Sequence, residues 1–310
     1  MVLIVCINIL TNRIISGKSV ETDFTSFFCV LKMRVRIVTD SASDISLELA
    51  ESLGITVVPV NVQFGEQVYR DRVDLTTDEF YEKLQTNSAL PKTSAPAPGT
   101  FRETYERLAQ EADAIVSIHV SSQLSATYDA ARLACADFDF PVSLVDSETA
   151  SMACGLLVII AAKAALQGGS RFEIEALVTE AIPRTITYGV FSTLEYLYKG
   201  GRIGRAQAFL GSVLKVSPIL AISRGEVLPV ARVRTRPRAI ERMCEIVGAL
   251  GTIEELSVMS TTDPQEAEDL ASRLSPLFPP ERMYRSSIGP AMGTYVGPGA
   301  VGVSVIWKAD

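Results

Sequence analysis

The sequence has little histidine and no surplus of basic residues, and both shortages exclude classes of function. It contains 29 basic and 36 acidic residues, for a formal net charge of -7 at pH 7. That balance argues against nucleic acid as a general partner, because phosphate-binding proteins usually show a basic footprint. The only histidine is His119, and no Cys-x-x-Cys pair accompanies it. A metal site of the zinc type is therefore not expected.

Cysteine usage points to a reducing compartment. The 310-residue chain has five cysteines, which follow no paired or metal-binding spacing: Cys6, Cys29, Cys135, Cys154 and Cys244. An odd, dispersed set in a chain of this length is typical of cytoplasmic proteins. We therefore expect a cytoplasmic protein.

The N-terminal segment does not match the rest of the chain in pattern. The apolar run Met1–Leu10 is far shorter than the roughly 20 residues that a membrane helix needs, so no stable membrane insertion is expected. Met33 precedes the first segment that reads as a strand of a globular domain. We interpret residues 1–32 as an extension outside the fold. The remaining length is sufficient for two domains.

Strands and helices alternate from residue 33 onward, which predicts a parallel sheet with its ligand site beyond the carboxyl ends of the strands. A buried strand is expected at 114–120, followed by a helix from Tyr128 to Ala136. The turn between them, 121–127, is rich in hydroxyls. These hydroxyls can cap the helix or hold an oxygen of a ligand. Two more polar turns, at Asp40-Ser41 and Asp146-Ser147, are expected at equivalent strand ends, which favours the ligand.

Other segments give weaker signals. We expect a proline-fixed loop at 92–99, whose Thr93 and Ser94 face the same crevice, and a rigid loop at 289–299. The apolar segment 151–166 predicts a buried helix, or else the wall of an apolar ligand channel. A hairpin turn is expected at 223–226. The alternation of Arg232, Arg234, Arg236 and Arg238 predicts one basic face on an extended segment.

Taken in order, several short motifs resemble the DegV family of fatty-acid-binding proteins. They are Val38–Ser41, Lys92–Ser94, Ser121–Tyr128, Val145–Ser147, Thr193–Leu197 with Gly200–Ile203, Arg234–Arg236 and Gly297–Ala300. The resemblance runs from about residue 35 to 308. It implies an α/β protein of two domains. The first, 33–168, would be Rossmann-like with a parallel sheet, and the second, 169–310, would have a mostly antiparallel sheet.

The resemblance also implies the ligand and its site. A long-chain fatty acid such as hexadecanoate would lie between the domains, its carboxylate held by Thr93 and Ser125, with Ser94 and Ala126 in secondary roles. Such proteins present the acyl carboxylate to a separate fatty acid kinase, so the chain would carry no catalytic residue, metal or cofactor of its own. Arg202, Arg234 and Tyr295 would lie on the headgroup or partner side. Tyr295 stands where the family usually has histidine, which puts support of phosphoryl transfer in question more than binding.

Two other functions remain open from the residues alone. A hydrolase could use Ser125 as nucleophile and His119 as base, although no Gly-x-Ser-x-Gly elbow is present. A phosphate-ligand protein could use 200–205 and the arginine segment, although the glycine spacing of a phosphate loop is missing. Both alternatives depend on where the fold places these side chains.

Overall fold

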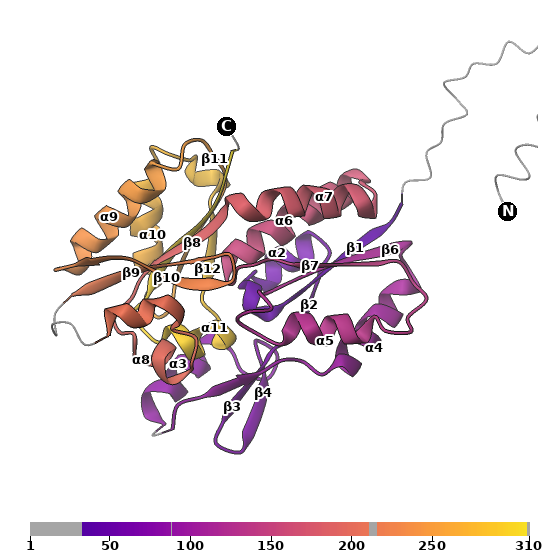
Figure 1. The fold of residues 1–310 in the computed structure, drawn as a ribbon, viewed down its shortest axis with the longest axis horizontal. Helices are drawn as coiled ribbons and strands as arrows, with labels where there is room; N and C mark the ends of the chain where they lie inside the picture. The colour runs from indigo at the N-terminus through magenta and orange to yellow at the C-terminus, as the bar shows by residue number, and fades with distance from the viewer. Residues whose placement is uncertain (1–32, 88, 211–215, 309–310) are drawn as a thin grey trace, which may run out of the picture. The chain divides into compact units, whose positions relative to one another are not determined.

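The computed structural model describes residues 33–87, 89–210 and 216–308 (Figure 1). The expected extension, residues 1–32, lies outside this range. Within the described residues, no helix is both long enough and apolar enough to cross a membrane.

The first sheet is parallel, as predicted. Its strand order is β2 (Ile55–Val58), β1 (Val35–Asp40), β6 (Ala114–His119) and β7 (Val142–Asp146). All neighbouring strands run parallel. Successive side chains of β1 alternate between faces, so that Ile37 and Val38 enter different clusters of the core. Helices therefore cover both faces, as in doubly wound proteins.

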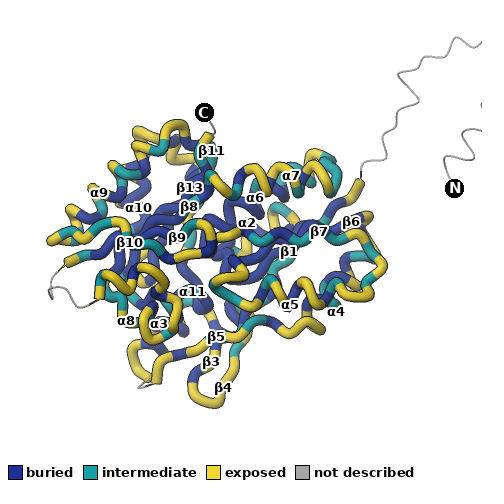
Figure 2. The backbone as a smooth tube through the Cα atoms, viewed as in Figure 1, coloured by how far each residue is buried: buried dark blue, intermediate teal, exposed yellow. Residues whose placement is uncertain are grey.

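Two sets of helices cover this sheet. The face that carries Val38 packs against α4 (Pro98–Ala109) and α5 (Thr127–Ala134). The face that carries Ile37 packs against α6 (Met152–Gln167), α7 (Arg171–Ala181) and the short α2 (Leu47–Ser52). Figure 2 shows the strands mostly buried and the outer helices exposed on one side.

The second sheet is mixed and mostly antiparallel, which confirms the predicted fold class. Its strand order is β10 (Glu226–Val233), β9 (Ser217–Ser223), β8 (Thr185–Val190), β13 (Val301–Trp307), β11 (Ile253–Ser260) and β12 (Tyr284–Ser287). Only β11 and β12 run parallel. One face packs against α9 (Arg236–Gly248) and α10 (Pro264–Leu274).

Helix α6 lies between the two sheets. It is apolar apart from Lys163 and Gln167, and Leu156, Leu157 and Ile159 are fully buried. Its cluster includes residues of both sheets, such as Ile37 and Ile306. Since residues 33–310 group as one compact unit, the division into 33–168 and 169–310 stays a prediction.

Two segments expected to be loops are regular elements. Residues 92–94 form β5 (Lys92–Ser94), which joins β3 (Asn61–Phe64) and β4 (Gln67–Arg70) in a small antiparallel sheet. The segment expected as a rigid loop contains α11 (Pro290–Val296). Proline is tolerated in the first turn of a helix, so the Gly-Pro pair marks a helix start here. The hairpin of β3 and β4 precedes α3 (Thr77–Thr86), whose Thr76 and Glu79 form a capping box.

The prediction of one basic face on an extended segment is wrong. Strand β10 ends at Val233, and α9 begins at Arg236, with Pro237 in its first turn. Because the segment changes from strand to helix, the alternation of an extended segment does not continue through all four arginines. Arg236 pairs with Glu266 through two contacts of 2.7 Å, and Arg238 pairs with Glu241. The arginine segment therefore gives no support to the phosphate-ligand alternative.

Candidate functional site

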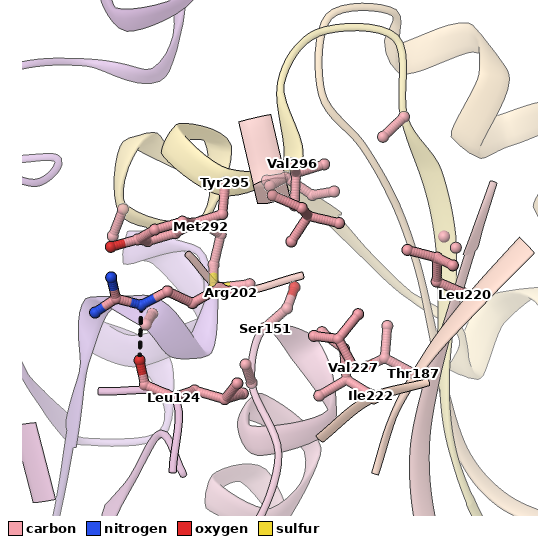
Figure 3. A pocket seen from close by; sticks show the side chains of 18 of the residues that line it. Leu124, Ser151, Thr187, Arg202, Leu220, Ile222, Val227, Met292, Tyr295 and Val296 are labelled. Carbon is pink, nitrogen blue, oxygen red and sulfur yellow. Dashed lines mark hydrogen bonds between the residues drawn. The ribbon is translucent and has the colours of Figure 1, made fainter. Parts of the chain in front are cut away.

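An apolar pocket lies between the carboxyl edge of the parallel sheet and the inner face of the second sheet (Figure 3). Residues after β1, β6 and β7 form one wall, among them Ala42, Leu124 and Ala150. Strands β8, β9 and β13 supply the other. From β1 the chain continues to β2 on one side of the sheet, and from β6 it continues to β7 on the other side. Open α/β sheets bind ligands at the point where the strand order reverses in this way.

One end of the pocket is polar. The hydroxyl of Thr93, on β5, lies 2.6 Å from the phenol oxygen of Tyr295, on α11. The Arg202 guanidinium lies 5.0 Å from the centre of the Tyr295 ring. Ser125 also lines the pocket. The structure thus brings four of the predicted residues, from four distant segments, to one site.

Arg202 is held by backbone oxygens. Its Nε donates to the carbonyl of Leu124 at 3.3 Å, and Nη1 donates to the carbonyl of Gly200 at 2.9 Å (Figure 3 shows the first of these). The turn after α8 (Glu195–Lys199) carries this arginine. A Cβ at position 200 would lie 2.5 Å from the Tyr295 ring, so glycine is required there by close packing.

Ser125 lies two residues before the start of α5, in the turn where the sequence predicts hydroxyls. Its Oγ lies 2.8 Å from Oγ1 of Thr127, and the Thr127 N–H donates to it at 3.3 Å. Thr127 is fully buried. The Ser125 hydroxyl thus both supports the helix start and lines the pocket. Beside it, Ala126 lines an adjoining polar hollow together with Ser122, Gln123, Arg202 and Glu226.

Two predicted residues lie elsewhere. Ser94 is exposed, and its hydroxyl faces Asn61 at 3.5 Å rather than the pocket. Arg234 is exposed beyond the end of β10 and does not belong to the pocket lining as the described residues define it. Their positions follow from the alternation along β5 and from the end of β10, respectively.

The structure does not assemble the pair that a hydrolase would need. His119 is fully buried, with Nδ1 2.9 Å from the Asp40 carboxylate and Nε2 2.7 Å from the Ser117 hydroxyl. Both ring nitrogens are therefore engaged away from Ser125. Asp40 also accepts a hydrogen bond from the N–H of Val120, so it links the end of β1 to the segment after β6.

A polar cluster behind the pocket wall was not visible in the sequence. Ser151 lines the pocket, and its hydroxyl donates to the buried carboxyl of Asp44 at 2.6 Å. The N–H of Gly289 donates to the same carboxyl at 2.9 Å. Burial raises the pKa of Asp44 to about 7, although Arg72, 3.8 Å away, opposes this shift. Ser151 has a φ of 55° and a ψ of -150°, a strained combination that is rare outside glycine.

The pocket suits a long apolar molecule with a small polar end. Hydroxyls can hold an oxyanion at the end near Thr93, with the Arg202 guanidinium beside them, while the remaining wall is almost entirely apolar. No group of histidine, cysteine, aspartate and glutamate side chains that could hold a metal ion occurs in the part of the chain that the structure describes. The fold and site therefore define an α/β protein with an apolar ligand pocket between two sheets.

Comparison with known proteins gives the family. The model of the family described as "Uncharacterised protein, DegV family" matches residues 34–308, and the chain belongs to the DegV family. A DegV domain-containing protein of Streptomyces coelicolor is 37% identical over 279 residues, which cover 89% of this chain and 99% of that protein.

Two solved structures are closely similar. A fatty-acid-binding DegV family protein from Thermus thermophilus has a TM-score of 0.84 and 31% identity, with 89% of this chain and 100% of that chain covered. DegV of Bacillus subtilis, described as a fatty acid binding protein, has a TM-score of 0.81 and 34% identity, with the same coverage.

Proposed function

We propose that this protein binds one long-chain fatty acid, such as hexadecanoate, with its carboxylate at Thr93 and Ser125. The observation that carries the proposal is the pocket itself, a mostly apolar cavity with Thr93, Ser125 and Tyr295 at one end. The other hydroxyls of its lining, those of Ser151 and Thr187, are hydrogen-bonded to Asp44 and Ser304. The fatty-acid-binding proteins of the same family support it.

The energetics of the pocket favour such a ligand. A carboxylate that leaves water needs several hydrogen-bond donors, or its desolvation is very costly. Thr93, Ser125 and Tyr295 carry hydroxyls at the polar end. Each buried methylene of the tail contributes about 0.8 kcal/mol. The tail therefore supplies most of the affinity, and the hydroxyls fix the direction in which the acid lies.

The proposal includes a partner. The protein presents the bound carboxylate to a fatty acid kinase, which forms an acyl phosphate. In support, the polar hollow adjoins the pocket and shares Ser125 and Arg202 with it. A guanidinium at that point matches the charge and shape of a phosphate group. On this proposal the chain is not an enzyme by itself.

The double substitution Thr93→Ala with Ser125→Ala tests the binding site. A hydrogen bond to a charged group contributes about 1.5–3 kcal/mol, so losing two should weaken binding by roughly two to four orders of magnitude. The measurement is mass spectrometry of the lipid extracted from the purified protein, with circular dichroism as the check of folding. Ser94→Ala, on the same strand as Thr93 but facing away from the pocket, is the matched control and should keep its lipid. Undiminished lipid in the folded double variant would refute the headgroup assignment.

A further inference from the structure

Two glycines face each other across the centre of the second sheet. Gly189 on β8 is the cross-strand partner of Gly302 on β13, and both line the pocket. Neither has a positive φ, so the backbone at these positions accepts any residue. The absence of a side chain therefore provides space rather than conformational freedom.

The two glycines make room for different groups at the pocket wall. A Cβ at position 189 would lie 2.9 Å and 3.3 Å from atoms of the Phe191 ring. A Cβ at position 302 would lie 3.4 Å from the Cγ of Met259 and 2.9 Å from the carbonyl oxygen of Tyr188. Phe191 and Met259 both line the pocket. Gly189 thus lets the Phe191 ring lie back against the sheet, whereas Gly302 leaves room for the Tyr188 carbonyl, with Met259 in ordinary contact beside it.

This pair lies at the end of the pocket away from the polar residues. Gly189 pairs on its other side with Leu220 of β9. In Figure 3, Leu220 lies on the opposite side of the pocket from Arg202 and Tyr295. A ligand whose polar end is held near Tyr295 would therefore direct its far end toward the two glycines.

We propose that the Gly189–Gly302 pair sets the length of the acyl chain that the pocket accepts. The inference rests on the proposed function, because it takes the carboxylate to be held at Thr93 and Ser125. The terminal methyl of the acid lies in the space bounded by Phe191 and Met259. Any group that pushes Phe191 forward, or that adds volume beside Met259, shortens this space.

The chain lengths of bound acids give the test. Delipidated protein is incubated with an equimolar mixture of tetradecanoate, hexadecanoate and octadecanoate, and the bound acids are measured by mass spectrometry. Burial of one methylene changes affinity about fourfold. In Gly189→Ala and Gly302→Ala, the ratio of bound octadecanoate to tetradecanoate should fall about fourfold or more. Gly99→Ala is the control, since a Cβ there meets nothing within 4 Å, and its ratio should stay unchanged.

A substitution that should change the ratio in the opposite direction keeps the test decisive if the glycine variants fail to fold. Phe191→Leu removes bulk from the same end of the pocket and should raise the ratio. A ratio that stays unchanged in Phe191→Leu and in the folded glycine variants, with acid still bound, would overturn the inference alone. If the unchanged protein takes up none of the three acids, the proposed function fails and the inference fails with it.

Discussion

The hydrogen bond between Thr93 and Tyr295 gives the sharpest prediction about the headgroup. Thr93 has a single hydroxyl proton, so if it donates to the carboxylate of the ligand, the phenol of Tyr295 must donate to Thr93 across their 2.6 Å contact. Tyr295→Phe removes that donor. The ring stays in place, so the contact with Arg202 is retained. A neutral hydrogen bond contributes about 1 kcal/mol, which corresponds to about fivefold weaker binding of hexadecanoate.

Thr93→Ala should cost more, because it removes a donor to a charged group. At about 1.5–3 kcal/mol, binding weakens by roughly 10-fold to 150-fold. In the double variant, the Tyr295→Phe substitution should have little additional effect, since its partner is already gone. The coupling energy between the two positions should therefore be about 1 kcal/mol.

Isothermal titration of delipidated protein with hexadecanoate measures these constants. Tyr198→Phe, on the exposed surface of α8, is the control for loss of a phenol and should bind as the unchanged protein does. Additive effects of the two substitutions would refute the chain of hydrogen bonds from Tyr295 through Thr93 to the carboxylate. A loss in Tyr295→Phe as large as in Thr93→Ala would instead show that the phenol contacts the carboxylate directly.

Two further predictions concern the partner and the pH dependence of stability. Arg202→Ala and Arg234→Ala should each keep their bound lipid, but phosphorylation by a cognate fatty acid kinase should fall about tenfold in kcat/KM, because one charge-assisted bond is lost. An empty pocket in either variant would instead assign that arginine to the carboxylate. Burial raises the pKa of Asp44 to about 7, so between the ordinary aspartate pKa and about pH 7 the folded protein keeps a proton that the unfolded chain has released. The free energy of unfolding should therefore fall as the pH rises through this range. Asp44→Asn should make this part of the pH profile flatter in chemical denaturation, and an identical slope in both proteins would contradict the assignment.

Local patterns in the sequence determined the elements that their own residues stabilise. The β-branched run at 114–119 forms a fully buried strand, and the hydroxyl turn after it precedes a helix, as expected. The Arg224-Gly225 turn has positive φ at both residues, as a two-residue hairpin requires. These features depend on neighbours within a few residues, which is why a sequence pattern predicts them.

The site could be predicted in part, through short motifs around Thr93, Ser125, Arg202 and Tyr295. What the sequence did not contain is their mutual geometry. Thr93 and Tyr295 are 202 positions apart, and their contact depends on β5 joining the β3 hairpin and on α11 packing beside it. The sequence predicts loops for both segments, since glycine and proline also mark turns.

Only the tertiary structure decided what lies behind and at the far end of the pocket. The Ser151–Asp44 contact joins positions 107 residues apart, and the Gly189–Gly302 pair depends on the register of two distant strands. The residues next to a glycine in the sequence do not reveal whether it forms a turn or leaves room for a group from a distant segment. Strand pairing and helix packing place these residues together because they bury the large apolar faces of β8, β13 and α6, a driving force that acts over the whole chain.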